Sequence, residues 1–131
     1  MRKFRLAAVI GLVAASVVGL SGAYAAPATA PSRCFNTRDW SGWTVSPDGR
    51  SMYIRTGVRN LYRLEFANAC RAAQGIGVHL VTRVRGSAFV CSPLDLDLKV
   101  SDGHMATPCI ISNITPLSAD EAAALPKALR P

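Results

Sequence analysis

Acidic side chains gather in one stretch, "CSPLDLDLKVSDG", which could hold a metal ion or an acid/base pair. An EF-hand calcium loop needs oxygen ligands at positions 1, 3 and 5 and a glycine at position 6. With Asp95 at position 1, Asp97 fits position 3, but Lys99 and Val100 stand at positions 5 and 6. The calcium motif fails. The regular alternation of apolar and polar residues instead predicts a half-buried strand from Leu94 to Val100.

The two histidines, His79 and His104, are the next candidates for catalysis or metal binding. Neither has a second histidine at ligand spacing, and the sequence contains no C-x-x-C pair, so we expect no metal site. His104 with Asp102 is one alternative, the acid/base pair of a small hydrolase or lyase. The sequence has no G-x-S-x-G elbow and no phosphate-binding glycine loop. We therefore expect a protein without enzymatic activity or cofactor.

Arginine shows the clearest pattern for binding. Five arginines fall on the polar faces or at the ends of neighbouring predicted strands: Arg55, Arg59, Arg63, Arg83 and Arg85. If these strands pair, the arginines form a basic stripe that suits an anionic envelope component or an acidic protein surface. The alternative is a solvated face that keeps the sheet soluble. The binding hypothesis rests on Arg55, Arg63, Arg83 and Arg85, with Trp40 as an aromatic contact.

Two tryptophans, Trp40 and Trp43, also allow two interpretations. Exposed side by side, they would stack against a sugar or a peptide. Buried, they would anchor a small core, as large aromatic side chains usually do. Trp43 is predicted to be buried because it begins an apparent strand, whereas the position of Trp40 is left open.

The N-terminal segment 1–25 is typical of a secretory signal peptide. Basic residues precede an apolar run, and an A-x-A pattern predicts cleavage after Ala25. Removing the three basic residues of this segment leaves twelve against eight acidic ones, a net charge of +4. We expect a periplasmic or secreted protein, with no membrane span after cleavage and no nucleic-acid partner.

Cysteine usage fits this location. Four cysteines remain after cleavage, and an even number in an exported chain predicts two disulfides. Three connectivities are possible. The favoured one joins Cys70 to Cys91, across neighbouring predicted strands, and Cys34 to Cys109, which would tie the two ends of the domain together.

The elements that must position these residues are mostly strands. We expect a flexible leader over residues 26–33, a disulfide-linked β domain over 34–118, and a short helix and tail over 119–131, with Ser118 and Glu121 as a capping box. Alternating residues and turn signals predict strands at 43–46, 51–56, 61–67, 78–85, 87–91 and 94–100, and segment 109–114 is either a last strand or an extended segment. In the strand at 61–67, Tyr62, Leu64 and Phe66 share one face. The expected fold is mainly β, a small twisted antiparallel barrel or half-barrel of about six short strands.

Four segments, "CF…W…YI", "LYRLEF…C", "VC…LDL" and "CIISNITPLS", give the chain a likeness to a known family. Their order resembles that in a family of small exported bacterial proteins of unknown function. The matching positions are Cys34, Trp43, Tyr62, Arg63, Cys70, Cys91, Cys109 and Ile111 or Ile114. The resemblance implies a bacterial periplasmic or secreted domain, and it carries over no catalytic residues because none are established for the family. The leading hypothesis is a non-enzymatic binding or inhibitory domain. The alternatives are the hydrolase or lyase and a structural envelope module without a ligand.

Overall fold

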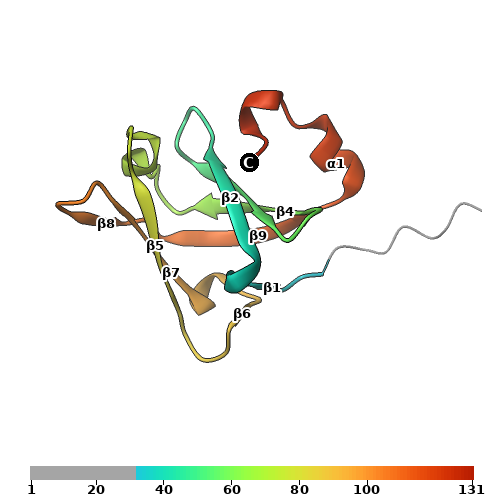
Figure 1. Ribbon diagram of the computed structural model, residues 1–131, viewed down its shortest axis with the longest axis horizontal. Helices are drawn as coiled ribbons and strands as arrows, with labels where there is room; N and C mark the ends of the chain where they lie inside the picture. The colour runs from blue at the N-terminus through green and yellow to red at the C-terminus, as the bar shows by residue number, and fades with distance from the viewer. Residues whose placement is uncertain (1–31) are drawn as a thin grey trace, which may run out of the picture.

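The computed structural model describes residues 32–131 and shows a mainly β fold (Figure 1). The predicted signal peptide and all but the end of the predicted leader lie outside the described residues. The strands are β1 (Phe35–Asn36), β2 (Trp40–Val45), β3 (Ser51–Thr56), β4 (Asn60–Phe66), β5 (His79–Val84), β6 (Phe89–Val90), β7 (Leu96–Ser101), β8 (Ala106–Pro108) and β9 (Ile111–Leu117). The helices are the α-helix α1 (Ala119–Ala124) and the short 3-10 helices η1 (Thr37–Asp39), η2 (Arg71–Gln74), η3 (Pro93–Asp95) and η4 (Lys127–Leu129).

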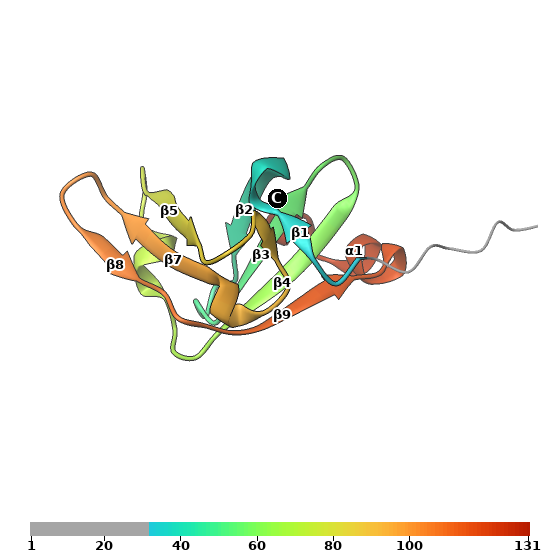
Figure 2. The ribbon, with the colours of Figure 1, turned by 90° about the horizontal axis from the view of Figure 1, so that it is seen from below.

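The strands of the described chain form three antiparallel sheets, with orders β2-β3-β4-β9, β5-β7-β8 and β1-β6. The predicted fold class is confirmed, but residues 32–131 form nine strands rather than about six, and their sheets do not close into a barrel. The chain passes from the three-stranded sheet into the four-stranded sheet at Cys109, between β8 and β9 (Figure 2). Strands β2 and β5 are left as edges of their sheets.

The four-stranded sheet follows the predicted alternation closely. In β4, Tyr62, Leu64 and Phe66 share one face, and all three are buried; Ile54 of β3 lies opposite Tyr62. The Tyr62 hydroxyl donates to the carbonyl oxygens of Ser32 (2.9 Å) and Cys34 (3.2 Å), and burial raises the pKa of this tyrosine. These bonds attach the start of the described chain to the core.

The three-stranded sheet corrects the prediction for the aspartate-rich segment. Strand β7 begins at Leu96, and its apolar residues are buried, but Leu94 is 80% exposed. Pro93 starts the 3-10 helix η3, and the carboxylate of Asp95 accepts the backbone N–H groups of Cys91 (2.9 Å) and Ser92 (2.8 Å). These hydrogen bonds hold the pKa of Asp95 below its usual value. The first turn is therefore a cap and not strand, because Asp95 bonds locally to backbone groups.

The predicted disulfide pairing is wrong. The bridges join Cys34 to Cys91 and Cys70 to Cys109. Strand β1 pairs with β6, so Cys34 and Cys91, at the adjoining ends of these strands, come within 4.2 Å between Cα atoms. Strand β4 pairs with β9, which brings together the segments that hold Cys70 and Cys109. Two disulfides indicate an oxidising, exported compartment.

The C-terminal segment confirms the predicted capping box and helix. Ser118 accepts the N–H of Glu121 (3.2 Å), and the Glu121 carboxylate accepts the N–H of Ser118 (2.7 Å). The segment leaves β9, one edge of the four-stranded sheet, and ends with Pro131 against Gly42 on β2, the other edge. It therefore crosses the outer face of this sheet. No helix of the described chain is long and apolar enough to cross a membrane.

Candidate functional site

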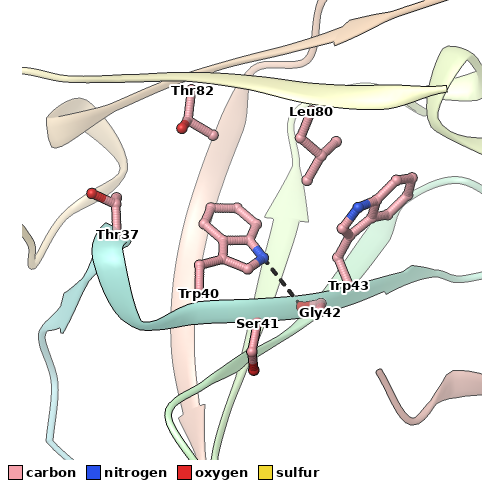
Figure 3. A pocket seen from close by; sticks show the side chains of 7 residues that line it. All are labelled: Thr37, Trp40, Ser41, Gly42, Trp43, Leu80 and Thr82. Atoms are coloured by element: carbon pink, nitrogen blue, oxygen red, sulfur yellow. Dashed lines mark hydrogen bonds between the residues drawn. The ribbon is translucent and has the colours of Figure 1, made fainter.

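An open cleft of about 560 Å³ lies between β2 and β5 (Figure 3). These are edge strands of different sheets and do not pair with each other. The lining residues come from the turn before β2, from β2 itself and from β5: Thr37, Trp40, Ser41, Gly42, Trp43, Leu80 and Thr82. The cleft remains open because the four-stranded and three-stranded sheets are not hydrogen-bonded to each other between β2 and β5.

A β-bulge places both tryptophans in the cleft. Trp43 lies opposite Ile54 of β3, whose side chain is buried, so Trp43 faces inward. Residues three apart on a regular strand point to opposite faces. The register shifts between Trp40 and Gly42, however, and Trp40 lies opposite Thr56, which is also buried. The extra residue in the bulge therefore turns Trp40 to the same face as Trp43.

The indole of Trp40 is fixed from two sides. Its Nε1 donates to the carbonyl oxygen of Gly42 at 3.1 Å. The rings of Phe35 and Trp40 pack in a T-shaped arrangement, with 6.1 Å between centroids and 89° between planes. Phe35 packs in turn against Tyr62, with 4.9 Å between centroids. The orientation of Trp40 is thus set by the core and by its own strand.

Trp43 is less constrained than Trp40. Both side chains are half-buried, so Trp43 is more exposed than predicted. The indole nitrogen of Trp43 has no hydrogen-bond partner among the described residues, and Figure 3 shows it turned toward the space beside Trp40. Leu80 and Thr82 of β5 face the two indoles from the other side of the cleft.

The polar groups of the cleft are neutral. The Ser41 hydroxyl points away and lies 3.5 Å and 3.4 Å from the carbonyl oxygens of Arg55 and Gly57. The hydroxyls of Thr37 and Thr82 have no hydrogen-bond partner in the described part of the chain. None of the lining residues from the described range 32–131 carries a charge. The cleft therefore offers two aromatic faces, two hydroxyls and one indole N–H.

The predicted arginine stripe is divided between two sheets. Arg55 and Arg63 lie on the outer face of the four-stranded sheet, where Arg63 forms an ion pair with Glu65 at 3.0 Å. Arg83 lies in the three-stranded sheet, opposite Asp97, because β5 pairs with β7 rather than with β4. Arg85 follows the end of β5. Strand pairing does not align the four arginines, and only Trp40 of the predicted set lines the cleft.

Asp102 and His104 belong to the exposed turn between β7 and β8. The Asp102 carboxylate accepts the backbone N–H groups of Met105 (2.8 Å) and His104 (2.9 Å), which hold the pKa of Asp102 below its usual value. In this arrangement Asp102 stabilises the turn, and His104 reaches it only through the backbone. Within residues 32–131 there is no group of three or more His, Cys, Asp or Glu side chains that could hold a metal ion.

The sequence gives no signal for three of the cleft residues, Thr37, Leu80 and Thr82. Their types are common on strands and turns, and they come together only because two sheets meet.

Comparison with known proteins adds a family but no described activity. Among curated proteins and among solved structures, no significant match is found. Over its full length, residues 1–131, the chain matches and so belongs to a family described as a family of unknown function (DUF6491).

Proposed function

We propose that the protein is an exported, non-enzymatic binding domain and that its ligand enters the cleft between β2 and β5. The predicted signal peptide and the two disulfides support a periplasmic or secreted location. The observation that carries the proposal is the pair of half-buried tryptophans that the bulge turns into one cleft.

The tryptophans favour binding over a purely structural role. Full burial of an aromatic side chain contributes strongly to the stability of a small domain. Trp40 and Trp43 are only half-buried, and the indole nitrogen of Trp43 has no hydrogen-bond partner within residues 32–131. Tryptophan is also enriched among the residues that dominate the energy of binding interfaces. A ligand that covers both indoles would complete the burial.

The lining of the cleft favours binding over catalysis. General acid–base catalysis needs a titratable side chain within hydrogen-bond reach of the reacting group. Among the residues that the structure describes, no histidine, carboxylate, lysine or cysteine lines this cleft. The nucleophilic side chains of this described lining are hydroxyls, and no base lies beside them to activate them.

An anionic partner bound by arginines is the weaker candidate for the binding surface. Arg55 and Arg83 lie in different sheets, and Arg63 is already paired with Glu65. The outer face that holds Arg55 and Arg63 is also crossed by the C-terminal segment. These residues fit a solvated surface that adds to the net positive charge.

Blocking the cleft tests the proposal. The chain has two tryptophans and both line the cleft, so tryptophan fluorescence, excited at wavelengths that tyrosine does not absorb, reports on this site alone. Thr82→Phe narrows the cleft opposite the tryptophans, whereas Val81→Phe places the same ring on the outer face of β5 and serves as the matched control. We expect fractions of a bacterial envelope extract to change the fluorescence of the wild type and of Val81→Phe but not of Thr82→Phe. If no fraction does so, or if Thr82→Phe responds equally, the cleft is not the binding site.

A further inference from the structure

We infer that the cleft binds a sugar ring of an uncharged glycan. This inference rests on the proposed function, because it names the class of ligand for the same cleft. It depends on three features of the lining: the fixed plane of Trp40, the unpartnered polar groups around it, and the absence of charge.

The fixed indole suits a flat ligand face. A pyranose ring presents a face of C–H groups that can lie against an aromatic ring. The hydrogen bond to Gly42 and the T-shaped contact with Phe35 hold Trp40 in place before any ligand arrives. Binding to an ordered side chain avoids much of the entropy cost of immobilising it. Leu80 on β5 supplies apolar surface on the opposite side of the cleft.

The polar groups suit a ligand rich in hydroxyls. Trp43 presents an indole N–H, which only donates, whereas the hydroxyls of Thr37 and Thr82 can donate or accept. A purely apolar ligand would cover these groups without replacing the hydrogen bonds they make to water, which costs free energy. Sugar hydroxyls around a stacked ring can supply both donors and acceptors to these three groups.

The neutral lining disfavours a charged ligand. A carboxylate or phosphate drawn into the cleft would lose solvation without gaining an opposite charge. None of the basic residues in the described part of the chain lines the cleft. A phosphorylated or uronic sugar therefore fits this cleft less well than a neutral one.

A peptide fits less well for a different reason. Peptides commonly add to a sheet edge as an extra strand through regular backbone hydrogen bonds. The bulge between Trp40 and Gly42 interrupts the regular pattern of β2 where the tryptophans lie. A glycan needs no such regular backbone edge. The volume of about 560 Å³ lies within the usual range of small-molecule sites, and the open sides leave room for a longer chain.

Titration with defined sugars tests the inference. The probes are maltotriose, cellotriose and chitotriose, with trigalacturonic acid as the charged counterpart and an extended hexapeptide of alternating valine and threonine. Binding is followed by calorimetry and by the two indole N–H signals in NMR spectra, one from each tryptophan. We expect a neutral trisaccharide to shift the Trp43 signal. We also expect Thr82→Phe to lose at least about tenfold in affinity, with Val81→Phe close to wild type. Preferential binding of the peptide or the charged sugar in the cleft would overturn the inference.

A second measurement separates this inference from the proposed function. An envelope fraction that changes wild-type fluorescence is treated in one of two ways and then freed of reagents and enzymes. The first treatment is periodate, which cleaves vicinal diols, followed by chitinase and lysozyme, which cleave the 1,4-linked N-acetylhexosamine chains that lack such diols. The second treatment is protease. We expect the effect to be lost with the first treatment and to survive the second. A fraction that keeps its effect after the first treatment, but loses it with protease and with Thr82→Phe, would leave the binding function intact and refute the glycan. If no sugar and no fraction acts on the cleft, both proposals fail.

Discussion

The two larger sheets of this protein are built from the same alternation of apolar and polar residues, but their faces are covered to different extents. The four-stranded sheet has a packed inner face, and the C-terminal segment crosses its outer face. In the three-stranded sheet, β7 buries its apolar residues, whereas β5 is an edge strand with mostly exposed residues. Leu80 and Thr82 have the same inward orientation as the core residues opposite them, Val100 and Leu98. The inward-facing residues of β5 thus follow the same apolar–polar alternation as those of β7. The cleft arises because the four-stranded sheet does not cover them, and not because the alternation changes.

The largest expected effect comes from removing the disulfide that lies where the chain passes between these sheets. Cys70 and Cys109 are 39 residues apart, and the chain-entropy treatment gives about 4 kcal/mol for closing a loop of this length. That is a large part of the roughly 5–15 kcal/mol of net stability typical of a domain. We expect the double variant Cys70→Ser/Cys109→Ser to lose stability by about this amount in urea unfolding followed by circular dichroism.

Peptide mapping under non-reducing conditions provides the control for this prediction. Linked peptides should contain Cys34 with Cys91 and Cys70 with Cys109. A linked peptide that joins Cys70 to Cys91 would contradict the strand pairing described above. The Cys70–Cys109 disulfide would then not lie where the chain passes between the two sheets.

The next effect compares one leucine from each sheet. Leu64 of β4 is fully buried, whereas Leu80 of β5 lies half-buried beside the cleft. Leu64→Ala should destabilise by about 2–5 kcal/mol, because it removes transfer free energy and leaves a cavity. Leu80→Ala should cost about 1 kcal/mol or less, because much of this side chain already contacts solvent. The difference is measured by urea unfolding of both variants. Equal losses would show that β5 is packed in solution and that the cleft is closed.

Sequence patterns predicted the packed parts of the molecule best. The alternation in β3, β4 and β7 follows directly from burial on one face, so Tyr62 and Leu64 could be placed before the structure was known. The capping box at Ser118 was equally local. Such features depend on residues close together in the chain.

The disulfides and the cleft depended on contacts between distant segments. The predicted bridge from Cys70 to Cys91 assumed that the segments holding them are neighbours, but β4 pairs with β9. The bulge that turns Trp40 into the cleft has no clear mark in "WSGW" beyond one glycine. The arginine stripe also required strand neighbours that the chain does not form. Local patterns set which face of a strand is buried, whereas pairing between strands decides what that face meets.

The smallest expected effect is a loss of stability in acid at the turn before β7. The pKa of Asp95 is lowered from its usual value of 3.8 by hydrogen bonds from the backbone N–H groups of Cys91 and Ser92. A carboxyl group whose pKa is lower in the folded state than in the unfolded state stabilises the fold at any pH above the unfolded-state pKa. This contribution is lost as the pH falls through the folded-state pKa. The wild type should therefore lose stability as the pH drops below 3.8.

Asp95→Asn tests this prediction because asparagine keeps an acceptor oxygen but does not titrate. We expect its melting temperature to be lower than that of the wild type at neutral pH and the difference to shrink below pH 3.8. Asp97→Asn is the matched control, since Asp97 lies two residues along on the face of β7 that pairs with Arg83. Because the Asp95 hydrogen bonds lie in the turn before β7, the effect should appear first in hydrogen exchange of Cys91 and Ser92, while the amides of β4 stay protected. If acid opened β4 at the same pH as this turn, the two sheets would unfold as one unit and the difference between them would be confined to side-chain packing.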